Sequence, residues 1–169
     1  MSANPNTQPV ELSAYSPMWP AVFEIEKARL TEIFGFGTVL VEHVGSTAVP
    51  GLEAKPVIDL LLGLRQLPPS LRLTDYESLG DAGIPGRLYF RKRGTVSFNV
   101  QAVELGGRLW RDAVVFRDYL RAHPEERERY AAKKRETFES GATTLLRYSD
   151  AKAALLAEML DRARRWAAG

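Results

Sequence analysis

The feature that most constrains the fold is a pair of apolar, β-prone runs joined by a Gly-Ser-Thr turn. The first run covers residues 38–44 and leads into Gly45-Ser46-Thr47. The second covers residues 56–62 and is apolar except at Asp59, a pattern typical of a strand covered on both faces. An isolated carboxylate in such a strand is costly unless it is hydrogen-bonded, ion-paired or bound to a metal. The sequence therefore predicts a buried central strand in which Asp59 meets a specific partner.

The turn and the lysine before the second run indicate an anion-binding site. Glycine permits a tight turn, and Ser or Thr can cap a short helix whose backbone N–H groups favour an anion. We therefore expect Gly45-Ser46-Thr47 and Lys55 to bind the phosphate of a nucleotide or another phosphorylated small molecule, beside Mg²⁺ or Mn²⁺ held by Asp59. The alternative is a plain strand-to-helix turn with a solvated lysine, in which Asp59 is the buried partner of Lys55 or Arg91.

Length and composition favour one globular domain. The chain has 169 residues, of which 45% are hydrophobic and 26% charged, and this suits a single core. Residues 1–17 contain three prolines and are expected to form an arm, and residues 18–169 the domain. The absence of cysteine excludes disulfides and thiolate chemistry, and a histidine count of two argues against a structural zinc site.

The same properties bear on partners and location. No apolar run approaches the roughly 20 residues that a membrane-spanning helix needs, so no membrane partner is expected. The polar opening lacks the basic and apolar regions of a signal peptide, which favours a cytoplasmic location. A net charge of +2 is too small to favour nucleic acid as a partner.

Periodicity predicts an α/β (α+β) fold in which a small mixed sheet is flanked by helices and the C-terminal part is helical. Apolar residues at helical spacing predict an amphipathic helix over 18–34 that ends at Gly35. The elements expected after it are strands at 38–44 and 56–62, a helix at 76–82, a hairpin of strands 87–92 and 95–104, and helices at 109–121, from Pro124 to near Ser140-Gly141, and from a cap at Ser149 or Asp150.

Alternation in the second hairpin strand predicts a polar sheet face. Ser97, Asn99 and Gln101 fall on one side, and the apolar residues between them fall on the other. If this strand neighbours the one that carries Asp59, the amides of Asn99 and Gln101 project toward the same cleft and can hydrogen-bond a base or ribose. The competing interpretation is a solvated strand face.

The first hairpin strand carries a group of basic residues. Arg87, Arg91 and Arg93 share a face with Tyr89 and can form a basic lip for an anionic ligand. An exposed edge strand that resists aggregation explains the same pattern. RNA binding by this hairpin, which would weaken steeply with salt, ranks behind both interpretations, because the net charge of +2 does not favour nucleic acid.

Two further groups are predicted to be structural. His43 lies on the same strand face as Val39 and Val41, so we expect a hydrogen-bonded core histidine. The basic residues of the helix after Pro124 are interspersed with glutamates and predict a solvated helix face, formed by Arg127, Arg129, Lys133, Lys134 and Arg135.

Three segments resemble one known family. They are His43–Asp59, Phe116–Pro124 and Tyr130–Lys134, and their order and spacing are similar to those of the GrpB family. The resemblance runs from about Tyr15 to the last helix. It implies membership of the nucleotidyltransferase superfamily, whose polymerase-beta-like core has Gly-Ser after one strand and acidic metal ligands on the next.

The resemblance also implies roles for individual residues. Gly45 and Ser46 would hold phosphate, Asp59 would be the catalytic metal ligand, and Lys55 with Arg91 would balance charge.

Two departures from the family pattern argue against two-metal catalysis. Leu61 stands where a second carboxylate is typical, and Asn99-Val100-Gln101 stands where many relatives carry His-x-His. Amides cannot act as general bases and are poorer metal ligands. We expect a nucleotide-binding or phosphate-ligand-binding protein with metal-dependent nucleotidyltransferase activity. The alternative, which Leu61 favours, is a catalytically inactive module that regulates or stabilises a protein partner.

Overall fold

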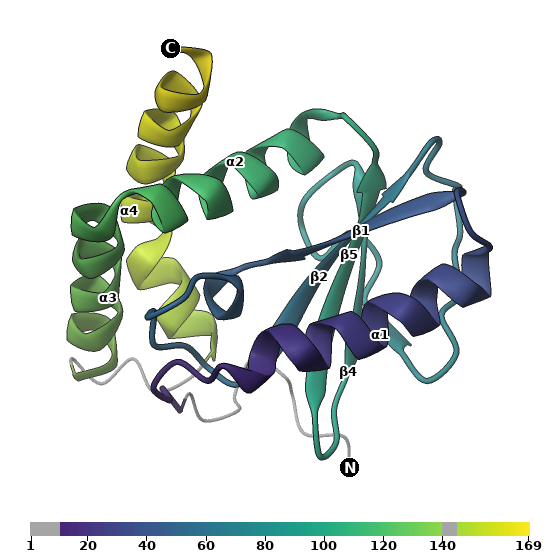
Figure 1. The fold of residues 1–169 in the computed structure, drawn as a ribbon, viewed down its shortest axis with the longest axis horizontal. Coiled ribbons are helices and arrows are strands. Elements are labelled where there is room, and N and C mark those ends of the chain that lie inside the picture. The colour runs from purple at the N-terminus through teal and green to yellow at the C-terminus, as the bar shows by residue number, and fades with distance from the viewer. Residues whose placement is uncertain (1–10, 140–144) are drawn as a thin grey trace.

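The structure, a computed structural model, describes residues 11–139 and 145–169, without the side chains of 145–152. Its elements in chain order are α1 (Met18–Phe34), β1 (Val39–Val44), the short 3-10 helix η2 (Ser46–Ala48), β2 (Val57–Leu64), β3 (Glu77–Ser78), β4 (Arg87–Lys92), β5 (Ser97–Glu104), α2 (Arg108–Ala122), α3 (Pro124–Glu139) and α4 (Leu145–Ala168). The strands form one mixed sheet in the order β1-β2-β5-β4-β3 (Figure 1). β2 and β5 are parallel and the other pairs antiparallel, which confirms the predicted α/β fold class.

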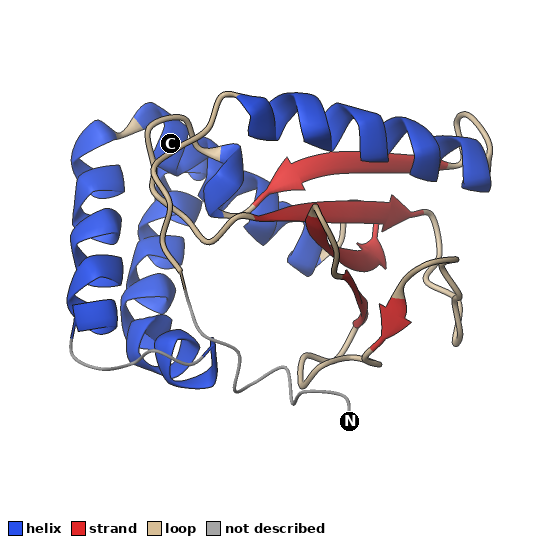
Figure 2. Ribbon diagram, turned by 90° about the horizontal axis from the view of Figure 1, so that it is seen from below, coloured by secondary structure: helices blue, strands red, loops and turns tan. Residues whose placement is uncertain are grey.

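Helix α1 packs against one face of this sheet (Figure 2). Alternate residues of β2 point toward it, and Ile58, Leu60 and Leu62 share a core cluster with Phe23 of α1. Burial of each such side chain contributes about 1.5–3 kcal/mol of hydrophobic free energy. This core fixes the orientation of β2 and therefore places Asp59 on the opposite face.

The opposite face is covered only in part. Leu109 and Trp110 of α2 pack against a small cluster that contains Leu61 and Val103. Helices α3 and α4 lie beyond one end of the sheet, beside the turn that follows β1 (Figures 1 and 2). The rest of this face carries polar side chains of β4 and β5. These side chains lie beside the region where the sheet meets α3 and α4.

One predicted element is wrong, and the last helix begins earlier than predicted. Residues 76–82 are not a helix, because Gly80 and Ala82 take positive φ angles and only the two-residue strand β3 forms there. The last helix begins at Leu145, so Ser149 and Asp150 lie inside it and do not cap it. Leu145 and Leu146, good helix formers, precede the expected cap and extend the helix.

Some of the predicted boundaries cannot be placed. The expected helix end at Ser140-Gly141 and the first ten residues of the arm lie outside the described residues. Ser13, in the described part of the arm, forms an isolated antiparallel bridge with Ala54, with hydrogen bonds of 2.8 and 3.0 Å. No helix in the described part of the chain is long and apolar enough to cross a membrane.

The packing of α2 on the sheet predicts the effect of Gly63→Ala. A Cβ at Gly63 would lie 2.6 Å from Cζ3 of Trp110, so the indole must move. We expect the free energy of unfolding to fall by about 1–3 kcal/mol, the usual cost of overpacking a core. Urea denaturation measures this, with Gly94→Ala as the control, because its Cβ would meet nothing closer than 3.9 Å. Equal stability of the two variants would contradict the close packing of Trp110.

Candidate functional site

Gly45 brings the turn after β1 directly against Asp59. Its φ is +73°, and a Cβ there would lie 2.5 Å from Oδ2 of Asp59, so both the backbone and the space require glycine. Gly45 itself is the N-cap of η2, without a side-chain cap. The expected capping role of Ser46 or Thr47 is therefore wrong, because both residues lie inside the short helix.

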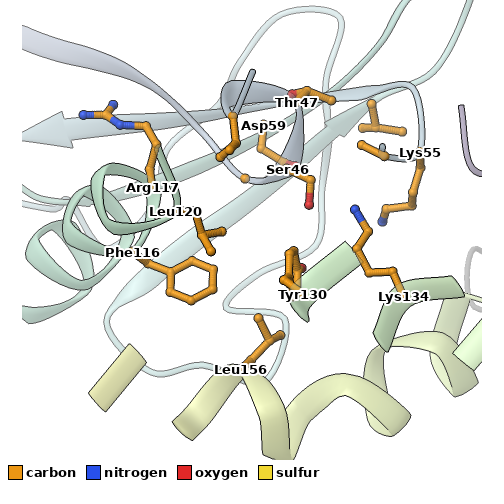
Figure 3. Close-up of a pocket in the computed structure, with 14 residues that line it drawn as sticks. Ser46, Thr47, Lys55, Asp59, Phe116, Arg117, Leu120, Tyr130, Lys134 and Leu156 are labelled. Atoms are coloured by element: carbon orange, nitrogen blue, oxygen red, sulfur yellow. The ribbon is translucent and has the colours of Figure 1, made fainter. Parts of the chain in front are cut away.

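A cavity of about 240 Å³ lies where this turn meets the C-terminal helices (Figure 3). Its polar wall includes Ser46, Thr47, Lys55, Asp59, Tyr130 and Lys134. Its apolar wall comes chiefly from the helices and consists of Val49, Phe116, Leu120 and Leu156. The cavity thus joins the turn after β1 and the start of β2 to side chains of the three C-terminal helices.

Asp59 is held by a chain of hydrogen bonds across the sheet. Nδ2 of Asn99 donates to Oδ1 of Asp59 at 2.9 Å, and the guanidinium of Arg93 donates to Oδ1 of Asn99 at 2.9 Å. Because Arg93 donates to the carboxamide oxygen of Asn99, the amide nitrogen of Asn99 is the end that faces Asp59. This confirms the prediction that Asn99 projects to the same side of the sheet as Asp59, which is half-buried and faces the cavity.

Helix α3 contributes Tyr130 and Lys134 to the cavity, two residues that the sequence did not place in the site. Lys134 was expected on a solvated face, but it is 1% exposed and its ammonium donates to the Glu53 carbonyl. That ammonium also lies 5.2 Å from the centre of the Tyr130 ring. Burial raises the pKa of Tyr130, and a hydrogen bond with Ser46 acts in the opposite direction. The spacing of four between Tyr130 and Lys134 is the signal that places both on one helix face.

Three of the other basic residues of that helix agree with the expected solvated face, whereas Arg127 is half-buried and donates to the Leu120 carbonyl. Arg129 and Arg135 are exposed, and they form ion pairs with Glu158 and Glu128 at 3.0 and 2.6 Å. Lys133 is half-exposed and pairs with Glu136 at 3.2 Å.

Three predicted ligand-binding residues, Arg91, Asn99 and Gln101, do not line the cavity. Nε of Arg91 donates to Glu77 at 2.5 Å, and Gln101 accepts a hydrogen bond from Arg87 at 3.0 Å. Arg91, Asn99 and Gln101 all stand on the sheet face that carries Asp59, but they are absent from the cavity wall. The structure therefore separates Arg91 and Gln101 from Lys55 and the Gly-Ser turn.

The residues at Asp59 fit a divalent ion that is shared with a phosphate ligand. Magnesium is often held by one or two carboxylates together with substrate phosphates and water. Leu61, in place of a second acid, is 1% exposed and packs with Val44 and Val103. Among the residues that the structure describes, no group of three or more acids and histidines could hold a metal ion. A divalent ion at Asp59 would therefore need further ligands from a bound phosphate or from water.

His43 is a core histidine, as predicted. It is buried, its Nε2 lies 2.9 Å from Oγ1 of Thr47, and its ring stacks on Phe23 at 4.7 Å. Burial, followed by the charges of Arg121 and Arg117, lowers the pKa of His43 from 6.5 to about 4. The neutral imidazole thus engages the Thr47 hydroxyl and supports the turn from behind.

This low pKa makes stability depend on pH. Between pH 6.5 and pH 4 the unfolded state binds a proton at His43 and the folded state does not, so stability falls as the pH falls. We expect His43 to reduce the free energy of unfolding by about 2 kcal/mol between pH 7 and pH 5. Urea titrations at both pH values should show a smaller loss for His43→Gln, which cannot titrate. Equal losses in the two proteins would exclude a buried neutral imidazole.

Comparisons with known proteins agree on one family. The family model described as GrpB protein matches residues 9–162. The UPF0157 protein YqkA of Bacillus subtilis is 33% identical over 95% of this chain, and the chain spans about half, 49%, of its length. A UPF0157 protein of Halalkalibacterium halodurans is 33% identical, over 94% of this chain and 85% of its own.

A solved structure agrees with the fold. The crystal structure of a conserved protein GrpB from Enterococcus faecalis is similar with a TM-score of 0.79 and 29% identity, over 92% of this chain and 99% of that one. The match of the family model covers most of the sequence, including every residue of the cavity wall. The chain therefore belongs to the GrpB family.

Proposed function

We propose that the protein binds a nucleotide or another phosphorylated small molecule in the cavity at Asp59. One observation carries this proposal: the Gly45-Ser46 turn, the carboxylate of Asp59, and the side chains of Lys55 and Lys134 all meet on a single cavity. A phosphate needs cations and hydrogen-bond donors, and a carboxylate beside it is tolerated when a divalent ion lies between them.

The two walls of the cavity match the two parts of such a ligand. Lys55 and Lys134 reach the cavity from the start of β2 and from α3, on the side where Ser46 lies (Figure 3). Phe116 and Leu156 line the other side and provide apolar surface for the organic part of the ligand. The guanidinium of Arg117 points away from the cavity, so this residue contributes only its stem (Figure 3).

Asp59 would hold a Mg²⁺ or Mn²⁺ ion that is shared with the phosphate. When bound, this ion supplies charge neutralisation at the phosphate oxygens. Asn99 occupies Oδ1 of Asp59, and Oδ2 lies on the side of the Gly45 backbone. On this basis we extend the proposal to metal-dependent nucleotidyl transfer, the reaction type of the nucleotidyltransferase superfamily that the sequence resembles.

A ligand that binds only the folded protein raises the unfolding temperature, so thermal unfolding tests the proposal. Nucleotides are added one by one, with and without Mg²⁺ or Mn²⁺. A binder at about 100 times its dissociation constant adds roughly 2.7 kcal/mol to the free energy of unfolding. We expect an upward shift that requires the metal, and we expect Asp59→Asn to remove the metal requirement while the protein stays folded. Metal dependence that persists in Asp59→Asn would place the ion elsewhere.

Replacement of Lys134 tests the phosphate contact. Lys134→Met keeps the apolar stem and removes the charge, so we expect the affinity for the nucleotide found in the thermal screen to fall about tenfold or more. Lys133→Met is the matched control, because Lys133 is the adjacent lysine and its side chain pairs with Glu136 on the outer side of the helix. Calorimetric titration measures both. Equal effects of the two substitutions would mean that the loss comes from general charge and not from the cavity.

A second candidate function is a catalytically inactive module that regulates or stabilises a partner protein. The observation that favours it is Leu61, which fills the place of the second carboxylate with buried apolar surface. Absence of any thermal shift across the panel, with or without metal, would favour this function over the first.

A further inference from the structure

We propose that the sheet face centred on Arg91 and Tyr89 is a second anion-binding subsite, so that the protein holds two anionic groups, one on each side of Asp59. The chemistry fits a phosphate or carboxylate of a second substrate. The role as a co-substrate site rests on the proposed function, whereas binding of the anion does not. We call the two places the cavity subsite and the sheet subsite.

The sheet subsite is defined by one row of residues across the strands. Glu77 pairs with Arg91, Arg91 with Asn99, and Asn99 with Asp59. Paired residues point to the same face, and neighbouring strands lie about 4.8 Å apart, so the Arg91 backbone is about 10 Å from that of Asp59. An anion held by the Arg91 guanidinium would therefore lie on the β5 side of Asp59, away from β1 and the Gly45 turn.

Arg91 has unused donors although its side chain is largely buried. The side chain is 11% exposed, and its one hydrogen bond within the described part of the chain is from Nε to Glu77. A guanidinium has five N–H donors in a planar fork that fits two anion oxygens at once. Neither terminal nitrogen is among the fully buried polar atoms that the described residues leave without a partner. The terminal nitrogens of Arg91 are therefore not fully buried, and a small anion can approach their N–H groups.

Tyr89 adds a second donor on the same face. Tyr89 pairs with Gln101 in the neighbouring row of the sheet. Burial, followed by the charge of Asp59, raises the pKa of Tyr89. The hydroxyl thus stays protonated. Within the described residues, the Tyr89 hydroxyl has no hydrogen-bond partner. The Arg87 guanidinium lies 4.8 Å from the centre of the Tyr89 ring, so this contact involves only the aromatic face. An anion between Arg91 and Tyr89 would accept from both.

The charge around these donors also favours an anion. The described hydrogen bonds of Arg87 and Arg93 go to backbone carbonyls and amide oxygens, which leave both charges without a carboxylate bonded to them. Glu77 is the acid that meets Arg91, and its side chain is 56% exposed on the two-residue strand β3. Such an exposed partner is held weakly and can give way to a ligand.

A purely structural role for Arg91 makes an opposite prediction for Glu77→Gln. If Arg91 only ties β3 to β4, loss of the Glu77 charge does nothing for anions. If Arg91 binds an anion, the same change removes a competitor and should tighten binding about threefold to fivefold. The exposed position of Glu77 leaves the core of the fold untouched by this substitution.

The test is an NMR titration of the full chain with inorganic phosphate. The side-chain amide of Asn99 reports the sheet subsite, and the backbone amide of Ser46 reports the cavity subsite. We expect Glu77→Gln to lower the dissociation constant seen by Asn99. We expect Tyr89→Phe to raise it about fivefold and Arg91→Met about tenfold or more. The Ser46 curve should not change in any of the three, and Arg72→Met, at an exposed loop position, should change neither curve.

Several outcomes would overturn the sheet subsite. The first is an Asn99 signal that does not respond to phosphate. The second is phosphate binding by Glu77→Gln that is unchanged or weaker. The third is that Arg91→Met and Lys134→Met each shift the curves of both reporters together, as a single site would. Should Arg91→Met fail to fold, Glu77→Gln and Tyr89→Phe decide the matter. A response at Asn99 without one at Ser46 would retain the sheet subsite and remove the proposed cavity ligand, so the two proposals fail separately.

Discussion

The hydrogen bond from Asn99 to Asp59 fixes the geometry on which the rest of the site depends. It exists because β2 and β5 are parallel neighbours in a register that sets these two residues side by side. Parallel pairing requires the chain to cross from β2 to β5, and the hairpin partner β4 and the short strand β3 are formed on the way. Arg93, in the turn of that hairpin, then holds the far end of the carboxamide. One oxygen of Asp59 is thus tied to the sheet, and the other lies against Gly45.

The cavity depends equally on the packing of the C-terminal helices against the loop between the first two strands. Val49 and Leu52 of this loop are fully buried in a cluster with Leu120, Tyr130 and Met159. Hydrogen bonds join the same bodies, since Arg121 donates to the Ala48 carbonyl at 2.8 Å and Lys134 donates to that of Glu53. Hydrophobic contact and backbone hydrogen bonds therefore hold α3 where its polar residues face Asp59. The site cannot form until the last helices have docked.

Sequence patterns predicted the part of the site that is local. The Gly-Ser turn needs a glycine, β2 needs apolar residues on both sides of one acid, and β5 alternates, so Asp59 and Asn99 could be placed on one face from period-2 spacing. Burial of Lys134 could not be predicted in this way. Its neighbours in sequence are charged, and a partner for the buried ammonium, the Glu53 carbonyl, comes from a tertiary contact far along the chain. The position of Arg91 was predicted for the right face, but the pairing of β4 with β5 places it one strand too far from the cavity.

The balance of charge follows from what occupies the positions next to Asp59. Leu61 and the amides of Asn99 and Gln101 bring no negative charge next to Asp59. Lys55, Lys134 and Arg91 bring three positive charges, of which that of Arg91 is paired with the exposed Glu77. A metal ion needs anionic ligands, and a phosphate needs cations and N–H donors. Under the proposed function, the face around Asp59 would attract the anion first, and a divalent ion would gain affinity with the phosphate already in place. In a site with two acids the order would be reversed, because the carboxylates would hold the ion before the substrate arrives. With the buried Leu61 in place of a second acid, the protein's own cations, and not the metal, would organise the proposed site.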